Sequence, residues 1–397
     1  MAETAETVVI GGGVVGACTA YLLAKQGNDV CILEQESVAS GCTGHGHGVI
    51  SLVGKDFKPG AHFALGLVSF HLYPEFVAGV EEDSGIDPLY HELDGLSFAV
   101  IEEEERIFRD FMAREDTRDH VDMRWIDVAE ARELEPRLTE DAIGGVLYRH
   151  GQVDGHRLAT AAATAAQLLG GRLVLGEATG LLVEGGRIRG VKTRGGEIAC
   201  ERVVVASGAW AYAAGEWLGF PVPVRPYHGE VLQMRLPGEP LKIFILTARH
   251  GPILPRRDGI LLVGSIGGVS MTGADVDTAH VFDPLNPPPP EFDGVPREAS
   301  RELIIFQATR VMPALERADV LAHLAGFRPL CADRMPLIGP VPGLEGAYVA
   351  TGHGTKGIHL APATARIVAD LIASGRSDLP VSLEAFLPSR FADAETG

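Results

Sequence analysis

The sequence is poor in the features that mark nucleic-acid-binding, membrane-spanning and disulfide-stabilised proteins. It has 34 Lys and Arg residues against 53 Asp and Glu residues, which gives a formal net charge of −19 at pH 7. Nucleic acids and anionic membrane surfaces bind basic faces, so neither partner is expected. No apolar run reaches the roughly 18 residues that a membrane span requires, and residues 1–6 lack the positive charge that opens a signal peptide.

Cysteine is also scarce. There are five cysteines, and they form neither a CxxC pair nor a spacing typical of metal ligands: Cys18, Cys31, Cys42, Cys200 and Cys331. We therefore predict a reduced, cytoplasmic protein without disulfides and without a bound metal. An apolar content of 46% and a charged content of 22% are those of a globular protein, and 397 residues are enough for two or three domains.

The N-terminal region predicts a strand, a glycine turn, a helix and a second strand. Residues 7–10 form a short apolar run that stops at three glycines, and residues 14–26 carry small and apolar side chains at helical spacing. Residues 30–33 are a second apolar run, which ends at Glu34. This order is that of a right-handed βαβ unit with buried parallel strands.

The glycine turn of this unit predicts a dinucleotide site. Gly11 permits the tight turn, Gly13 lets the backbone approach a pyrophosphate, and Gly16 lets the helix pack closely on the strand. The helix N-terminus offers N–H groups to phosphates. Glu34 can accept hydrogen bonds from a ribose hydroxyl and would repel a 2′-phosphate, which disfavours NADP.

The rest of the chain predicts two interleaved domains. A helix over 152–169 precedes strands at 172–175, 180–183, 187–191 and 202–205, and a helix over 361–374 ends the apolar, glycine-rich part. Residues 222–325 differ, with antiparallel strands at 231–234 and 259–264, a proline loop at 286–290 and a helix over 297–312. We predict an α/β protein: a Rossmann-like domain (1–80, 150–220, 325–397) interleaved with an α+β substrate domain on an antiparallel sheet (81–149, 221–324). The acidic run at 102–105 is interpreted as a solvated helix face.

Several further motifs resemble one flavoprotein family. They are residues 40–48 (SGCTGHGHG), 206–210 (ASGAW), 325–329 (AGFRP), 333–339 (DRMPLIG) and 352–362 (GHGTKGIHLAP). Together with the N-terminal unit they resemble, in order and over nearly the whole chain, the D-amino-acid oxidase, glycine oxidase and sarcosine oxidase superfamily. The resemblance implies FAD as the cofactor.

The resemblance also assigns places around the FAD. Residues 40–49 would run beneath the pyrophosphate and flavin ring, the backbone of Ala178 would recognise the adenine, and residues 352–358 would close over the ring at the start of the last helix. Lys356 would add positive charge there, although a solvated lysine at a helix start is an equally open interpretation. The expected cofactor-binding residues are Gly11, Gly13, Val14, Val15, Gly16, Glu34, Gln35, Cys42, Thr43, His45, His47, Gly48, Val49, Ala178, Ser207, Gly208, Trp210, Gly326, His353, Gly354, Thr355, Lys356, Gly357 and Ile358.

For the substrate, the resemblance singles out Arg328, with His47, Thr355 and Lys356 as further catalytic candidates. The family's arginine in this Gly-x-Arg-Pro motif pairs with the substrate carboxylate through both prongs of its guanidinium group. A planar, permanently charged group suits that task. A structural ion pair is the alternative for Arg328.

Two histidines and one cysteine bear on flavin attachment. His45 aligns with the histidine that resembling dimethylglycine and sarcosine dehydrogenases join to the flavin, but we expect non-covalent FAD, with the link through His45 as the alternative. The His45–His47 pair could begin a metal site, but no third ligand is evident nearby. Cys331 lies five residues too late to match the flavin-linked cysteine of sarcosine oxidases and is interpreted as a packed thiol.

The chain departs from glycine-oxidase-like sequences at two positions. Pro252 stands where they place a tyrosine near the substrate, and Thr355 stands where they carry an arginine. A pocket without that aromatic could admit a bulkier amine, such as an N-substituted glycine. His228 is a candidate for the wall of the same pocket, but a histidine satisfied within the core or sheet is the favoured interpretation.

The predicted function is therefore FAD-dependent oxidation of the C–N bond of an amino acid or amine to an imine that hydrolyses. No general base is needed, because the protein has only to orient a neutral amine and exclude water. The alternatives are a 2-hydroxy-acid dehydrogenase, an amine dehydrogenase that passes electrons to a quinone or carrier instead of O2, and a flavin-bearing subunit without turnover. Whether the chain forms a homo-oligomer is left open.

Overall fold

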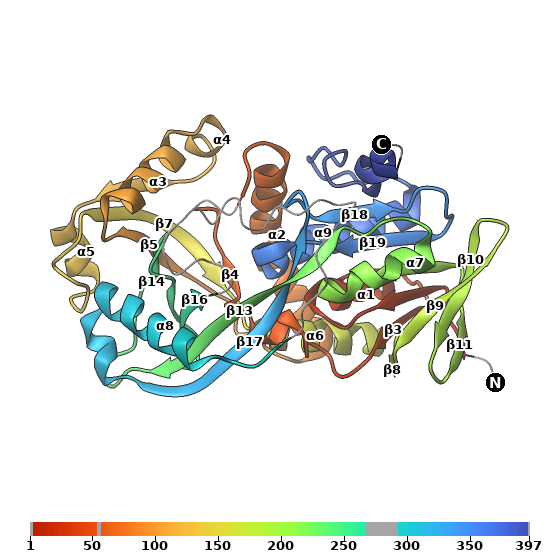
Figure 1. Ribbon diagram of the computed structural model, residues 1–397, viewed down its shortest axis with the longest axis horizontal. Coiled ribbons are helices and arrows are strands. Elements are labelled where there is room, and N and C mark those ends of the chain that lie inside the picture. The colour runs from red at the N-terminus through yellow and green to blue at the C-terminus, as the bar shows by residue number, and fades with distance from the viewer. Residues whose placement is uncertain (1–2, 54–56, 267–292, 396–397) are drawn as a thin grey trace.

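Three β-sheets organise the chain in the computed structural model, which describes residues 3–53, 57–266 and 293–395 (Figure 1). The predicted proline loop at 286–290 lies outside the described residues. The chain begins beside the smallest sheet, next to β11, whereas its C-terminal end lies near β18 (Figure 1).

The first sheet has six strands and contains the N-terminal βαβ unit. Its strand order is β18 (Leu337–Pro340), β19 (Ala347–Thr351), β12 (Arg202–Val205), β2 (Thr7–Ile10), β3 (Val30–Glu34) and β8 (Arg172–Leu175). All neighbours are parallel except β18 and β19. Strands β2 and β3 are buried at every residue, as expected of a parallel sheet covered on both faces.

Helices α1 (Val14–Lys25), α6 (Gly155–Leu168) and α9 (Gly357–Ser374) pack beside this sheet. Small residues such as Ala17, Ala20, Ala161 and Ala361 are fully buried between them, because short side chains let helix backbones approach closely. A four-stranded sheet covers the other side in the order β1 (Glu3–Thr4), β11 (Gly196–Ala199), β10 (Arg187–Thr193) and β9 (Ala178–Glu184).

The largest sheet has nine strands and is almost entirely antiparallel. Its order is β17 (Asp319–Cys331), β13 (Val224–Arg235), β16 (Leu261–Ile266), β15 (Ile253–Pro255), β14 (Phe244–Leu246), β5 (His91–Ala99), β7 (Gly144–Gln152) and β4 (Val49–Ile50), with β6 (Met123–Ile126) on β7. Only β14 and β5 pair in parallel. The predicted fold class, a Rossmann-like unit combined with an α+β unit on an antiparallel sheet, is confirmed.

The remaining helices lie around these sheets. They are α2 (Ala61–Ser84), α3 (Glu102–Ala113), α4 (Glu115–Arg118), α5 (Val128–Leu134), α7 (Ala214–Leu218) and α8 (Glu298–Val311), with 3₁₀ turns η1 (Cys42–His45), η2 (Gly208–Ala213), η3 (Pro313–Arg317), η4 (Gly354–Lys356) and η5 (Pro388–Glu395). The strands and helices predicted from the sequence are present, and α9 begins four residues earlier than expected.

The interpretation of residues 102–105 as a solvated helix face is wrong for Glu104. Glu104 in α3 is completely buried and accepts hydrogen bonds from the backbone N–H groups of Val100 (2.9 Å) and Arg249 (2.8 Å). Its Oε1 also lies 3.1 Å from His250 Nδ1. Glu103 forms an ion pair with Arg249. Arg249 and His250 lie about 145 residues further along the chain, so no local pattern could reveal these partners.

Helix α2 is long and apolar enough, by length and composition alone, to cross a bilayer, although polar residues interrupt its apolar run. Its residues instead contact α9 and α6. Ser69 Oγ donates to the backbone oxygen of His359 (2.6 Å), and the Tyr73 hydroxyl donates to that of Ile358 (2.9 Å). A core helix of this kind passes the same length and composition test, and here α2 supports the start of α9.

The sheets draw on separated parts of the chain. The six-stranded sheet takes strands from residues 7–34, 172–205 and 337–351, and the large sheet takes β4 from the N-terminal part and the rest from residues 91–152 and 224–331. This distribution does not by itself fix domain boundaries, so the predicted division into two interleaved domains stays a prediction.

Candidate active site

A cavity of about 1370 Å³ extends from the carboxyl ends of β2, β3 and β12 to helices α3 and α8. Ligand pockets for single small molecules are usually about 300–1000 Å³. The carboxyl ends of parallel strands are also where open α/β sheets bind ligands. The cavity is therefore large enough for a dinucleotide together with a second molecule.

At the strand end of the cavity, the turn after β2 is possible only with glycine. Gly11 has φ +110°, and a Cβ there would lie 2.6 Å from the backbone oxygen of Ala206. A Cβ on Gly16 would lie 2.0 Å from the backbone oxygen of Gly11. Gly16 does not line the cavity; it allows α1 to pack on the turn, as the sequence predicted.

Gly13 is different, because the protein itself leaves room for a side chain there. The nearest atom to a Cβ would be Thr43 Oγ1 at 3.4 Å, an ordinary contact distance. The space lies at the N-terminus of α1, where Thr43 Oγ1 accepts a hydrogen bond from the N–H of Val14 (3.0 Å). A bare backbone beside a helix N-terminus is an arrangement that admits a phosphate.

Glu34 is held rigidly at the end of β3. Its Oε2 accepts a hydrogen bond from the N–H of Gly12 (2.7 Å), and its Oε1 accepts one from the N–H of Glu36 (2.9 Å). The side chain is buried and lines the cavity. Each carboxylate oxygen keeps a second lone-pair direction for a ribose hydroxyl.

The loop after β3 carries η1 and forms the middle of the cavity wall. His45 Nδ1 donates to the backbone oxygen of Gly41 (2.9 Å), so its Nε2 carries the lone pair. The ring packs against Gly326 of β17, where a Cβ would lie 3.1 Å from His45 Cβ. Burial raises the pKa of the Cys42 thiol, and the charge of Arg328 acts in the opposite direction.

His47 is neutral at physiological pH. Its Nε2 contacts the backbone oxygen of Gly264, and its own backbone oxygen accepts from Gln152 Nε2 (3.2 Å). The pKa of His47 is lowered to about 4, because desolvation and the charge of Arg328 outweigh the bond to Gly264, which raises it. Within the described ranges, no group of three His, Cys, Asp or Glu residues could hold a metal ion around this pair or elsewhere.

Arg328 lies on β17 opposite Tyr227 of β13. Its guanidinium group lies against the backbone of Gly229, where a Cβ would come within 2.4 Å of it, and its Nη1 is 3.5 Å from the backbone oxygen of His228. The guanidinium carbon is 5.5 Å from the centre of the Tyr227 ring. These contacts, with the backbone and a ring face, fix the orientation of the guanidinium group at the cavity wall.

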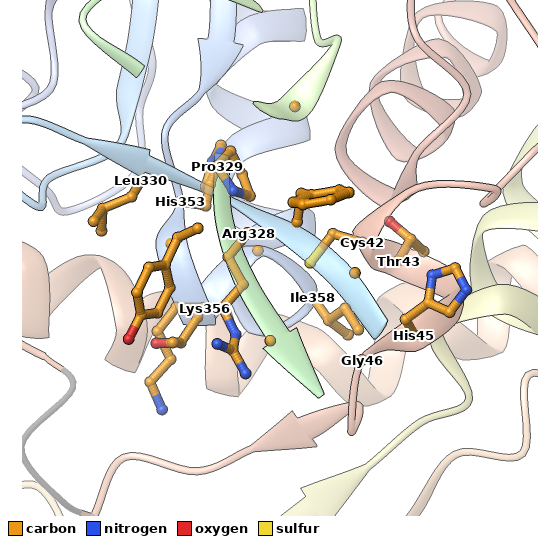
Figure 2. A pocket seen from close by; sticks show the side chains of 18 of the residues that line it. Cys42, Thr43, His45, Gly46, Arg328, Pro329, Leu330, His353, Lys356 and Ile358 are labelled. Carbon is orange, nitrogen blue, oxygen red and sulfur yellow. The ribbon is translucent and has the colours of Figure 1, made fainter. Parts of the chain in front are cut away.

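Lys356 is buried, so its interpretation as a solvated lysine is wrong. Its Nζ lies 4.8 Å from the centre of the Phe57 ring and 3.5 Å from the backbone oxygen of Ser51. Figure 2 shows the side chains of Arg328 and Lys356 extending in the same direction, with Cys42, Thr43 and His45 on the opposite side. Two cationic side chains from β17 and η4 thus reach the same part of the cavity.

The start of α9 closes this part of the cavity. His353 is buried, its Nε2 is 3.0 Å from Thr364 Oγ1, and burial lowers its pKa to about 3. Residues 353–358 line the cavity. The first N–H groups of α9 lie in this segment and favour negative charge.

The structure brings nearly all predicted residues to one cavity. The predicted residues in its wall are Gly11, Gly13, Val14, Val15, Glu34, Gln35, Cys42, Thr43, His45, His47, Gly48, Val49, Ala178, Ser207, Gly208, Trp210, Gly326, Arg328, His353, Gly354, Thr355, Lys356, Gly357 and Ile358. Pro252 also lines it, whereas His228 and Cys331 do not. Cys331 is a buried thiol, as interpreted.

Sequence reasoning missed a second group of lining residues. They come from α2 and the segment before it, from the loop after β14, and from α3 and α8, and include Phe57, His62, Glu103, Ile107, Asp110, Arg249, Leu303, Phe306, Gln307 and Arg310. The three- and four-residue spacing of these side chains in α3 and α8 could have indicated that they share one face of each helix. Nothing in the sequence shows which face lines a cavity.

The residues present fit FAD. Gly13 leaves open space at a helix N-terminus for the pyrophosphate, Glu34 presents fixed acceptors for a ribose, and the start of α9 supplies N–H groups for the electron-rich side of a flavin. A β2–α1–β3 unit with such a cavity and an antiparallel sheet beside it defines a flavin-dependent oxidoreductase.

Comparison with known proteins leads to the same class. Residues 6–371 match the family described as FAD dependent oxidoreductase, and the chain belongs to that family. It is 31% identical to a glycine oxidase from Pseudomonas putida, covering 92% of this chain and 94% of the other. It is 29% identical to the glycine oxidase of Geobacillus kaustophilus, and its structure matches the solved one with a TM-score of 0.87 over 98% and 99% of the two chains. An L-proline dehydrogenase structure from P. horikoshii is also similar (27% identity, TM-score 0.82, full coverage of both).

These findings confirm the predicted family, the FAD cofactor and the class of reaction, oxidation of amines or amino acids by an FAD-dependent enzyme.

Proposed function

We propose that this enzyme oxidises the C–N bond of a carboxylate-bearing amine, an N-substituted glycine, with the carboxylate held by Arg328. The observation that carries the proposal is the placement of Arg328 on the cavity wall, backed by Gly229 and Tyr227 and accompanied by Lys356. A guanidinium group matches a carboxylate through two parallel hydrogen bonds. In a protein with a net charge of −19, a local cation is needed to attract an anionic group.

The same cations favour the reactive form of the amine. A substrate amine arrives mostly as an ammonium ion, and positive charge nearby disfavours that form. Neutral His47 adds no further charge, and its Nδ1, which carries the lone pair, can accept a hydrogen bond from the amine N–H. The side chains thereby bind the carboxylate, fix the Cα–H direction and help the nitrogen to lose its proton.

FAD, when bound, supplies the two-electron acceptor for this oxidation. The substrate loses the Cα hydrogen as a hydride and the N–H as a proton, and its C–N single bond becomes C=N. Water then hydrolyses the imine to a carbonyl compound and an amine. We propose O2, which is reduced to hydrogen peroxide, as the final electron acceptor.

The lack of an aromatic side chain at Pro252 supports a substituted amine rather than glycine itself. Pro252 lines the cavity on the loop between β14 and β15.

We also propose that the chain is organised as two interleaved domains and that the protein is located in the cytoplasm.

A substrate screen on the purified yellow protein tests the function. Sarcosine, larger N-substituted glycines, glycine and 2-hydroxy acids are each mixed with the enzyme without oxygen, and bleaching of the flavin absorption is followed. With oxygen, peroxide is measured. We expect N-substituted glycines to bleach the flavin fastest and to yield peroxide. Bleaching by 2-hydroxy acids alone would contradict the proposal and indicate a 2-hydroxy-acid dehydrogenase. Bleaching without peroxide would indicate a quinone or carrier as the electron acceptor.

A further inference from the structure

The cavity continues into a region that no FAD motif lines. Helix α3 contributes Glu103, Ile107, Asp110 and Phe111, and α8 contributes Leu303, Phe306, Gln307 and Arg310. We call this region the outer chamber. Both sets recur at three- and four-residue spacing, so each helix presents one continuous face to it. Both helices lie at the opposite end of the molecule from β9, β10 and β11 (Figure 1).

Among the described residues, the outer chamber contains apolar surface that is not buried by packing. Helix α8 buries Ile304, Ala308 and Val311 in the core beneath the large sheet. Phe306 is 58% exposed although it lines the cavity, and Leu303 is half-buried beside it. Apolar side chains left open inside a concave site are a mark of ligand contact rather than of folding.

The charges of the outer chamber are mostly matched. Arg249 pairs with Glu103, and Arg114, which also lines the cavity, holds Asp116 with hydrogen bonds of 2.9 and 2.8 Å. Asp110 and Arg310, of opposite sign, are both exposed at the rim, where water can solvate them. The chamber therefore has no net preference for a charged group. The part of the cavity that Arg328 and Lys356 line, in contrast, favours an anionic group.

We propose that the outer chamber is a substrate subsite that receives an uncharged apolar arm, alkyl or aryl, carried by the amine nitrogen. Phe306 and Leu303 contact the arm, while Arg328 holds the carboxylate. This inference rests on the proposed function and narrows its substrate to N-substituted glycines with a large apolar substituent.

Two pairs of ligands test the inference, one with turnover and one without. Sarcosine is compared with N-benzylglycine as a substrate, and butanoate with 4-phenylbutanoate as ligands, in which a CH2 group replaces the nitrogen so that no oxidation is possible. Binding of the second pair is measured on the holoenzyme from the change in flavin absorption. We expect the aryl member of each pair to be favoured at least about tenfold, since even one methylene in an apolar pocket can change selectivity by roughly that factor.

Variants of α8 show whether the aryl preference arises in the outer chamber. Phe306→Ala removes the apolar contact and Gln307→Trp fills the chamber, so each is expected to lower the aryl preference about tenfold. Leu321→Ala, on β17 and 43% exposed but outside the cavity wall, is the matched control and leaves the preference unchanged. Because Phe306 and Gln307 lie on the surface of α8, these changes are expected to leave melting temperature and flavin content unaltered.

The outcomes separate this inference from the proposed function. Equal kcat/KM for sarcosine and N-benzylglycine, or an aryl preference that survives both Phe306→Ala and Gln307→Trp, overturns the subsite while the function stands. Tight, Phe306-dependent binding of 4-phenylbutanoate by a protein whose flavin no amine reduces supports the subsite and overturns the function.

Discussion

The two ends of the cavity are built in different ways. At the strand end, the contacts come from backbone and glycine positions within short stretches: the turn at Gly11 to Gly16, Glu34 at the end of the next strand, and Thr43 on the loop that follows. At the α3–α8 end, the contacts come from side chains that lie far apart in the chain, such as Glu103 and Arg249. At the first end, Gly11 and Gly16 leave no room for a Cβ, whereas we expect side chains at the second end to vary without loss of the fold.

The largest effect is expected at the strand end, from Gly16→Ala. The added methyl group would lie 2.0 Å from the backbone oxygen of Gly11, in a region that is buried on all sides. The turn must then shift, and with it the N-terminus of α1. We expect purified protein with little or no flavin, or no soluble protein, as measured by the absorbance ratio at 450 and 280 nm.

Gly180→Ala in β9 is the control for that experiment. There the nearest atom to a Cβ is Lys192 Cδ at 3.6 Å, so flavin content is expected to stay normal. Normal flavin content in Gly16→Ala would contradict the view that the turn has no room for a side chain at Gly16.

A smaller effect, confined to the substrate, is expected at Arg328. Arg328→Lys keeps the charge but loses the two-pronged geometry, so kcat/KM should fall roughly ten- to a hundredfold, and Arg328→Ala should fall further. A charge-assisted hydrogen bond contributes about 1.5–3 kcal/mol. Steady-state kinetics on the substrate found in the screen give these values.

Flavin content and melting temperature distinguish the roles of Arg328. Both are expected to remain at the level of the unchanged protein, because Arg328 lines the cavity and its guanidinium group contacts backbone and a ring face there. If Arg328→Ala instead unfolds or loses its flavin, the structural ion-pair alternative is correct. If it keeps full kcat/KM, the carboxylate is held elsewhere.

The same contrast explains what could be predicted from the sequence. The turn at Gly11, the acid at Glu34 and the strands around them follow from local pattern, and the family resemblance extends this to Arg328 and residues 352–358. The burial of Glu104, the shielding of Lys356 by Phe57 and the exposure of Phe306 depend on elements brought together by topology. Residues 102–105 show the limit: four consecutive acids look solvated until their partners are known.

A third prediction concerns the buried histidines that surround the start of α9. Burial lowers the pKa of His353 to about 3, and burial together with the charge of Lys356 lowers the pKa of His359 to about 3. In the unfolded chain each has a pKa near 6.5. Between pH 6.5 and about 3 the unfolded state therefore binds more protons than the folded one, so stability is lost as the pH falls through this window.

We expect the melting temperature to fall by several degrees between pH 7.5 and pH 5. In His359→Gln, which keeps a donor for the backbone oxygen of Gly66, the fall should be smaller. His71→Gln changes an exposed histidine of α2 and should leave the slope as it is. An unchanged slope in His359→Gln would show that this residue does not bind extra protons on unfolding. Differential scanning calorimetry across the pH range provides the measurement.

The smallest effect is expected at His45, on the boundary between the two ends. The Nδ1 atom of His45 donates a hydrogen bond to the backbone oxygen of Gly41, and the His45 ring packs on Gly326. The histidine therefore has a structural role that requires no bond to the cofactor. We therefore predict non-covalent FAD. After acid precipitation the flavin should appear in the supernatant, and His45→Ala should keep most of its flavin and release it in the same way. Flavin that stays in the pellet of the unchanged protein but not of His45→Ala would show a covalent link through Nε2, the nitrogen that the contact with Gly41 leaves with a lone pair.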